Sequence, residues 1–400
     1  MKRMVTITTM PLPLLASAFR PFYFLGTLYA VLLACVWTGA FLGHWDVPSV
    51  GTPLRLWHGH EMLFGFAAAI ITGIVLTALP SWAGTDEICG GRLALLVVLW
   101  LLGRLAFWTA PWLPPWAPAI ADLLLFPAVF VMVAPQLLRA SNRLYLLLLP
   151  ILLALAAANG VYHAGILVAH THLAGLGLRG AIYAIIVLYV LKGGVLTPIF
   201  TGNALREKGR GEQAPFNVEL EMLALGVVLL LAALDLTGAR PLWIGLAALA
   251  CAGVHAVRTA RWKGWRLADE PLVLVMHLGF AWLVFAFALK AIAELTGWIP
   301  EAAWVHAFTL GSLGLMMLGL MTRVSLRHTG RPLVVPAAMK LAYGMMFIAA
   351  LVRLAATVHG LGDRAVALAA VLWGLTFLLT FATFGAMLVR PSLPRNDASA

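Results

Sequence analysis

Charged side chains are scarce in this sequence. They make up 11% of its 400 residues, while hydrophobic residues make up 62%, and the mean hydropathy is +0.95. An ordinary soluble domain carries about 25% charged residues. The composition therefore excludes a soluble globular domain and predicts a chain that lies largely in lipid.

Cysteine is also rare, with single residues at Cys35, Cys89 and Cys251. These are too few and too scattered for a disulfide framework, a zinc ribbon or an iron–sulfur cluster. Because the sequence has no Cys-x-x-Cys-His, covalent attachment of a c-type haem is not expected. A cleavable signal peptide is not expected either, since the small residues Ala16-Ser17-Ala18 come before the first apolar run instead of after it.

Acidic residues are outnumbered, with 16 Asp and Glu against 27 Lys and Arg, which gives a formal charge of +11. A strongly basic chain can indicate nucleic-acid binding. Here the basic residues lie between apolar segments and form no basic domain. We therefore expect no nucleic-acid partner.

Apolar runs of membrane-spanning length recur along the chain. They cover about 22–43, 57–80, 92–110, 116–138, 144–168, 179–201, 218–236, 241–258, 271–294, 302–324, 335–357 and 365–389. Backbone groups in lipid must be hydrogen-bonded within their own segment, so helices are expected. The connections are short, and no internal repeat is evident. The sequence predicts an all-α membrane protein, with residues 1–400 forming one polytopic domain and a single bundle of about twelve transmembrane helices.

The connections differ in their content of Lys and Arg. If the N-terminus is inside, the inner connections and termini carry most of these residues, including Lys2, Arg3 and Arg395. Basic residues favour the cytoplasmic side of a membrane. Both termini are therefore expected to be cytoplasmic.

The second apolar run begins with Trp57-His58-Gly59-His60-Glu61-Met62. An ionisable group at membrane depth costs roughly 3 kcal/mol or more unless it is paired or liganded, and two imidazoles suit a metal ion or a haem iron. With the expected topology, His163 and His306 share the outer leaflet with this run. His58 and His60 diverge by about 200° on an ideal helix, so two ligands here would serve different centres unless the first turn is unwound.

Each of these features also has an ordinary interpretation. A lone histidine near a membrane interface is often an amphipathic anchor. The charges inside spans favour interhelical salt bridges over a propionate clamp or a proton path; they are Arg104, Asp122, Lys192, Lys290 and Arg353. Gly193-Gly194 and Pro198 predict a break or close packing in the sixth span, which transporters also use.

Two further histidines fall in the inner half of the chain's topology. His277 lies well inside the ninth span. His328 lies in the connection from Arg327 to Pro332, which suits an anion such as a haem propionate or a lipid headgroup, or simple anchoring to anionic lipid.

Several stretches, spread in order over nearly the whole chain, resemble the NnrS family of bacterial inner-membrane haem- and copper-containing proteins. Because they recur in order along the chain, the match is specific. They are Ala16–Phe22, Trp57–Phe66, Leu76–Trp82, Pro198–Leu205, His306–Gly311 and Met321–Pro332.

The resemblance implies a twelve-helix protein with haem b and copper that acts in the response to nitric oxide and limits nitrosative damage. We hypothesise that His60 and His306 hold haem, while His58, His163 and His277 complete the ligation of haem or copper. Glu61 is expected to orient a liganding histidine through its second ring nitrogen. Arg323 and His328 are further candidates for contact with the cofactor.

Two classes of function stay open, and no catalytic residue is predicted. The first is redox chemistry on nitric oxide or nitrosyl species, by a haem–copper oxidoreductase that takes electrons from a quinol or a separate protein. The second is a transporter that uses a broken sixth helix with Lys192 and Lys290. A haem-based sensor is a third, weaker interpretation. Membrane lipid is a partner in every case.

Overall fold

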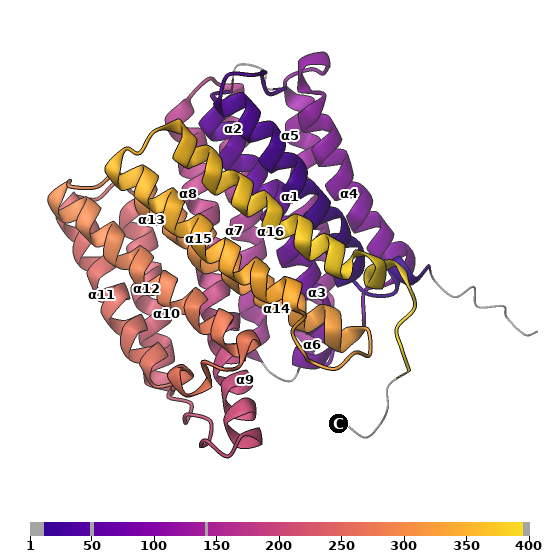
Figure 1. Ribbon diagram of the computed structural model, residues 1–400. Coiled ribbons are helices and arrows are strands. Elements are labelled where there is room, and N and C mark those ends of the chain that lie inside the picture. The colour runs from indigo at the N-terminus through magenta and orange to yellow at the C-terminus, as the bar shows by residue number, and fades with distance from the viewer. Residues whose placement is uncertain (1–11, 49–51, 141–142, 395–400) are drawn as a thin grey trace, which may run out of the picture.

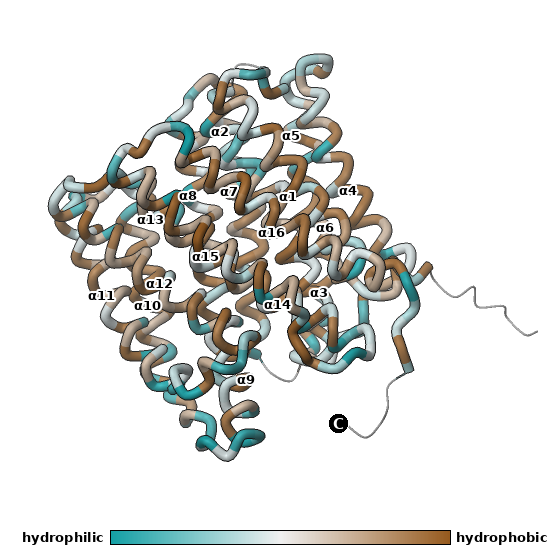
Figure 2. Tube along the Cα trace, viewed as in Figure 1, coloured by the Kyte–Doolittle hydropathy of each residue, from teal (hydrophilic) through white to brown (hydrophobic). Residues whose placement is uncertain are grey.

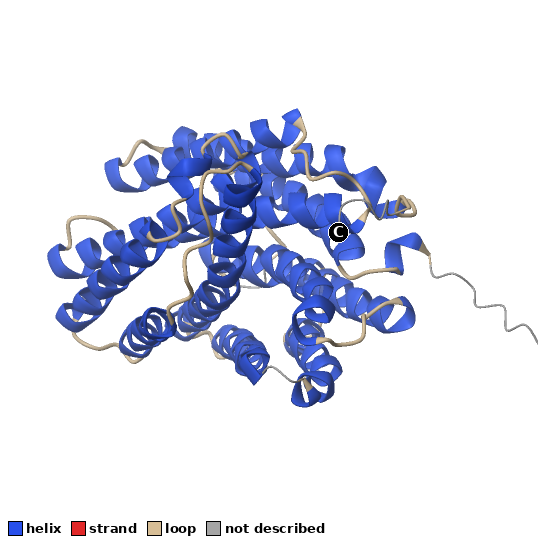
Figure 3. Ribbon diagram, turned by 90° about the horizontal axis from the view of Figure 1, so that it is seen from below, coloured by secondary structure: helices blue, strands red, loops and turns tan. Residues whose placement is uncertain are grey.

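The computed structural model describes residues 12–48, 52–140 and 143–394, and every regular element within these ranges is a helix (Figures 1 and 3). Eleven helical segments are long and apolar enough to cross a membrane. A twelfth long helix, α10 (Val218–Leu236), carries three carboxylates, Glu219, Glu221 and Asp235. The prediction of an all-α, multi-pass membrane protein is confirmed.

Five spans are composed of consecutive helical segments. They are α2 (Leu54–His60) with η2 (Glu61–Ala67) and α3 (Ala68–Ala83); α5 (Trp116–Leu123) with α6 (Leu125–Arg139); η4 (Arg143–Leu147) with α7 (Leu148–Leu167); α8 (Thr171–Leu188) with η5 (Tyr189–Gly193) and α9 (Gly194–Glu207); and α13 (Ala302–His306) with η7 (Ala307–Gly314) and α14 (Leu315–His328).

The other spans are single helices. Besides α10, they are α1 (Phe19–Phe41), α4 (Gly90–Trp108), α11 (Pro241–Ala260), α12 (Pro271–Thr296), α15 (Ala337–His359) and α16 (Asp363–Val389). Short 3-10 turns lie at η1 (Pro13–Leu15), η3 (Ala110–Trp112) and η6 (Gly264–Leu267).

Local sequence explains where several helices begin and end. Proline occupies the first position of α11 and α12, where its missing N–H is not needed. The side chain of Asn217 caps α10 by accepting a hydrogen bond from the Leu220 N–H at 2.9 Å. After α12, Gly297 turns the chain with a φ of 68°, which a residue without Cβ adopts freely.

Every fourth span lies at the centre of the bundle. These central spans are Leu54–Ala83, Thr171–Glu207 and Ala302–His328, and 89%, 67% and 72% of their most apolar stretches are buried, against 33% to 61% for the other apolar spans. Each central span also contains a π-helical segment, η2, η5 or η7. The structure therefore has a four-span period that is not evident in the sequence.

The outer helices close around the central spans. The last helix, α16, packs against both α15 and α1, so the two ends of the chain meet (Figure 1). Apolar residues follow the helices through the middle of the molecule, and hydrophilic residues gather in connections at its two ends (Figure 2). This distribution is what a membrane-spanning bundle requires.

Arg20 fastens the two ends of the chain together. Its guanidinium donates to the backbone carbonyls of Leu388 at 2.9 Å and Arg390 at 2.6 Å, and to the hydroxyl of Ser392 at 2.8 Å. These bonds satisfy carbonyls at the end of α16 that have no intrahelical partner. The cytoplasmic location of the termini and the single-domain organisation stay predictions; Lys2, Arg3 and Arg395 lie outside the described residues.

Candidate metal centres

The two histidines of α2 face different parts of the bundle. His60 is fully buried and faces α5 and α7, whereas His58 lines a cavity on the side of α13 and α15. This agrees with the wide angle between them on a helix. The structure therefore pairs His60 with His163 and His58 with His306, and does not bring His60 and His306 together.

The first of these places, the Asp122 cluster, is built on one carboxylate oxygen. Oδ2 of Asp122 lies 3.0 Å from Nε2 of His60 and 2.9 Å from Nε2 of His163. The amide of Asn159 donates to the same oxygen at 2.8 Å. All four side chains are buried. Two imidazole nitrogens and a carboxylate oxygen that converge in this way could hold a metal ion.

The imidazole of His60 is tightly positioned. Its ring lies between Phe107 and Tyr162, with centroids at 4.4 Å and 4.3 Å. Its Nδ1 lies 3.0 Å from Oε1 of Glu61. A carboxylate at Nδ1 fixes the tautomer in which Nε2 carries the lone pair that a metal needs. The contact expected of Glu61 from the sequence is therefore present.

Charges in the Asp122 cluster do not balance. The guanidinium of Arg104 bridges Glu61 and Asp122 and is hydrogen-bonded to both. Tyr29 donates to Glu61 as well. With both imidazoles neutral, two carboxylates and one guanidinium leave one negative charge, which burial makes costly unless a proton or a metal cation joins the cluster.

A cavity leads toward this cluster from the end of the bundle where α2 begins. Its volume is about 170 Å³, and its lining includes Thr52, Pro115, Tyr162 and His163. The cavity is large enough for several water molecules. A small hydrated ion could therefore approach His163 through it.

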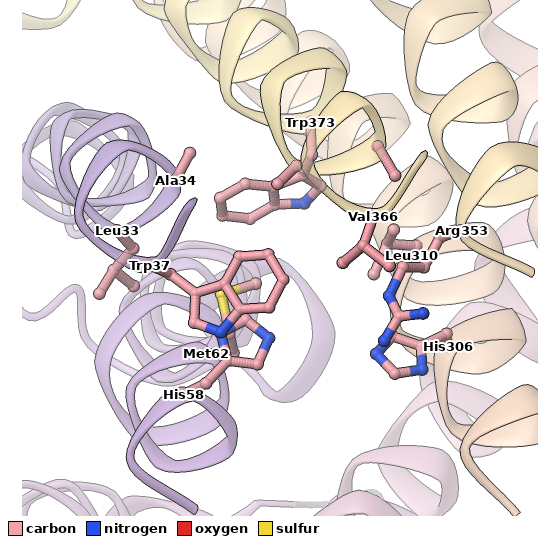
Figure 4. A pocket seen from close by; sticks show the side chains of 12 residues that line it. Leu33, Ala34, Trp37, His58, Met62, His306, Leu310, Arg353, Val366 and Trp373 are labelled. Carbon is pink, nitrogen blue, oxygen red and sulfur yellow. The ribbon is translucent and has the colours of Figure 1, made fainter. Parts of the chain in front are cut away.

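The second place, the His58 cavity, lies between the first and the last spans of the chain. Trp37 and His58 come from one side, and His306 and Arg353 from the other, with Trp373 beside them (Figure 4). The rings of Trp37 and His58 lie 4.6 Å apart. The cavity measures about 40 Å³, which holds an ion with a small ligand.

Arg353 brings an unbalanced positive charge to the His58 cavity. It is half-buried and donates to the hydroxyl of Thr357 at 2.5 Å. No Asp or Glu of the described residues forms an ion pair with it. The expected interhelical salt bridge is thus absent at this position. An unpaired guanidinium beside two imidazoles favours a ligand that carries an anionic group.

The other two charges predicted within spans are Lys290, which is paired with carboxylates, and Lys192, which lies over aromatic rings. Lys290 is buried and lies 3.1 Å from Asp235 and 3.2 Å from Glu294. The ammonium of Lys192 lies over the rings of Tyr145 and Trp82, at 4.1 Å and 5.2 Å. The salt bridges predicted for Arg104, Asp122 and Lys290 are therefore present.

Of the two alternatives predicted at Gly193-Gly194, a break or close packing, the structure shows close packing, because the guanidinium of Arg258 occupies the space that a Cβ of Gly194 would need. The chain stays helical from Thr171 to Glu207, with a π-helical turn at Tyr189–Gly193 in place of an unwound segment. A π-turn keeps backbone groups hydrogen-bonded, so it meets the demands of lipid better than a break. The transporter interpretation loses its broken helix and keeps only the two intramembrane lysines, Lys192 and Lys290.

A family model described as NnrS protein matches residues 13–392, which is nearly the whole chain. The chain belongs to the NnrS family. No curated protein matches it. Membership connects this membrane protein with the response to nitric oxide.

The NnrS resemblance suggested three further residues for contact with a cofactor. All three lie apart from both histidine sites. Nε2 of His277 lies 2.8 Å from the hydroxyl of Thr201. Arg323 lies over the ring of Phe200 at 3.6 Å. Seventeen helical residues separate Arg323 from His306, about 25 Å along the axis. A group held by His306 is therefore too far from Arg323 for contact.

His328 is further still from His306 in the same span. Its ring lies 5.8 Å from that of Phe19, and its backbone carbonyl accepts a hydrogen bond from Ser392. These contacts join the end of α14 to both ends of the chain. They give His328 a packing role in this NnrS protein.

Sequence reasoning missed Asn159 of the Asp122 cluster. It is four residues before His163 and therefore on the same face of α7, so the spacing to a histidine was the available signal. Met62, which follows His58 by four residues and so shares its helical face, lines the His58 cavity.

Proposed function

We propose that this chain binds haem b in the His58 cavity and copper at the Asp122 cluster, and that it performs redox chemistry on nitric oxide or nitrosyl species in the bacterial inner membrane. The observation that carries the proposal is the pair of separate sites with opposite charge deficits. Each contains two histidines, but one has an excess guanidinium and the other an excess carboxylate.

The donor set of the His58 cavity fits a haem. His58 and His306 would supply imidazoles to hold the haem iron, and Arg353 would pair with a propionate. The volume of about 40 Å³ is smaller than a porphyrin, so haem binding requires the side chains around the cavity to move apart. A copper ion fits less well here, because Arg353 would repel it.

The donor set of the Asp122 cluster fits copper. His60 and His163 offer Nε2 atoms, and Asp122 offers an oxygen. Imidazole is a common copper ligand. A cuprous ion carries the single positive charge that the cluster lacks.

Haem iron and copper, when bound, would supply the ability to bind nitric oxide and to exchange single electrons. The chain's own side chains would orient and shield these groups. Phe107 and Tyr162 hold the His60 ring in place, and Trp37 covers His58. Nitric oxide is neutral and dissolves in lipid, so it would reach these sites from within the bilayer. The electron donor would be a quinol or a separate protein.

Metal analysis of single variants tests the assignment. The purified protein is expected to contain both haem and copper. His58→Ala and His306→Ala should lose the haem absorption and keep copper, while His60→Ala and His163→Ala should lose copper and keep haem. His277→Ala is the matched control and should keep both. Unchanged haem and copper contents in all four site variants would overturn the assignment.

A visible spectrum tests the chemistry. Purified membranes that contain the chain should show a Soret band that shifts when nitric oxide is added. A colourless protein, or a band that nitric oxide does not change, would rule out the proposed redox role. His277→Ala should behave like the native chain in the same measurement.

A further inference from the structure

A third cavity, the axial cavity, is apolar and lies between the three central spans. Ile74 and Val75 of α3 line it on one side, Leu188 of α8 on another, and Leu313 and Met316 of the third central span on the remaining side. Its volume is about 60 Å³. Every residue that lines it belongs to one of the three central spans.

The lining of the axial cavity is almost entirely hydrocarbon. The charged residue at its edge, Lys192, lies with its ammonium over the rings of Trp82 and Tyr145. A buried water needs two to four polar partners, and apolar cavities of this kind stay dry and accept apolar gases such as xenon. The axial cavity is therefore suited to a small apolar molecule.

The axial cavity and the His58 cavity share one helical segment. Leu310 lines the His58 cavity, and Leu313, three residues later in η7, lines the axial cavity. The two cavities are thus neighbours along this π-helical segment. A molecule that passes from one to the other requires motion of the side chains around η7.

We infer that the axial cavity binds a small, neutral, apolar gas, of which nitric oxide is the relevant member, and holds it beside the His58 cavity. Its role as a reservoir that supplies nitric oxide to the metal site rests on the proposed function, whereas the binding of gas does not. Nitric oxide concentrates in lipid, and the cavity lies within membrane-spanning segments. A gas bound there would supply the metal site from inside the bilayer.

Xenon is the probe for the cavity itself. The ¹²⁹Xe NMR signal of xenon dissolved with the purified chain, corrected for detergent alone, should shift as the protein is added. Val75→Phe fills the cavity and should remove most of the shift, while Ile74→Ala enlarges it and should increase the shift. Val97→Phe makes the same change at a buried position outside the cavity and should leave the shift as in the native chain.

Equal shifts in the native chain, Val75→Phe and Ile74→Ala would overturn gas binding at this cavity. Ile74→Ala keeps the test decisive if Val75→Phe does not fold. The reservoir role is tested by stopped-flow mixing with nitric oxide, where Val75→Phe should slow the change of the haem spectrum several-fold and leave its end point unchanged. An unaltered rate would overturn the reservoir. If the purified native chain binds xenon but contains no haem, gas binding at the axial cavity is supported and the proposed function is overturned.

Discussion

Nδ1 of His60 lies 3.0 Å from Oε1 of its own neighbour in sequence, Glu61, at the point where α2 passes into η2. Adjacent residues of a regular helix point about 100° apart. The contact therefore depends on the local turn and on Arg104, which holds the carboxylate from α4. It fixes the direction in which Nε2 of His60 points.

Loss of the Glu61 carboxylate should weaken copper binding more than it changes the fold. Glu61→Gln keeps the size and one acceptor but removes the charge. Copper affinity should fall roughly 10- to 100-fold, the usual effect of changing a group that orients a metal ligand. Competition titration with a copper chelator measures this.

The matched control for that experiment is Glu294→Gln, which makes the same change next to Lys290. It should leave copper affinity unaltered. Equal losses in the two variants would mean that Glu61 acts only through general stability, and an unchanged affinity in Glu61→Gln would remove its positioning role.

Arg353 should determine how tightly haem is held. Arg353→Leu leaves a propionate without a partner, and a charge-assisted hydrogen bond contributes about 1.5–3 kcal/mol. Haem affinity should therefore fall by roughly one to two orders of magnitude, while Arg353→Lys retains part of it. Haem titration of the apoprotein, followed at the Soret band, gives both values.

Arg323→Leu serves as the control for Arg353, because Arg323 also lies in a span and contacts a ring instead of the cavity. Its haem affinity should equal that of the native chain. If Arg323→Leu lost as much haem as Arg353→Leu, the anionic group would belong nearer the other end of the bundle.

Arg20 should contribute strongly to stability. It is 2% exposed and donates to four groups at and just beyond the end of α16. Arg20→Ala leaves buried carbonyls without partners, at a cost of roughly 3 kcal/mol. Denaturant unfolding followed by tryptophan fluorescence should show a lower midpoint, and Arg20→Lys should recover part of the loss.

The exposed Arg92 provides the comparison for Arg20. Arg92→Ala should change the midpoint little, as surface substitutions usually do. A midpoint for Arg20→Ala that matched that of Arg92→Ala would show that the ends of the chain are held together by apolar packing alone.

A surface cluster outside the spans gives a prediction for pH. Hydrogen bonds from Arg210 and Lys208 hold the pKa of the Asp269 carboxyl below its ordinary value. A lowered pKa in the folded state stabilises the protein above the pKa of the unfolded carboxyl, about 3.9, and this contribution is lost as the pH falls through the folded value. The thermal midpoints of the native chain and Asp269→Asn should therefore differ slightly at pH 7 and converge below pH 4.

High salt should also reduce the difference at pH 7, because the cluster is exposed and ions screen it. A gap between the two midpoints that widened in acid would contradict the assignment of this carboxyl as the titrating group.

Much of the fold could be predicted from the sequence, because lipid imposes simple demands. Each span must be apolar and helical, and both properties are local. The separation of His58 from His60 also followed from helical geometry. This is a relationship within one span.

Relationships between spans could not be predicted. Nothing local shows that Asp122 meets His163, or that Arg353 lacks an acidic partner, because each depends on the order in which helices pack. The three π-helical segments were also unexpected, since an extra residue in a turn leaves no hydropathy signal. The central position of every fourth span became visible only through burial.

The two sites become complete at different stages of synthesis. The Asp122 cluster draws on the chain between Tyr29 and His163, so all of its side chains exist before the sixth span is made. The His58 cavity needs Trp37 together with Arg353 and Trp373, and is not closed until the last helix is inserted. A ribosome-bound precursor halted after α9 would thus possess the whole Asp122 cluster but only part of the lining of the His58 cavity. On the proposed function, copper would then be acquired before haem.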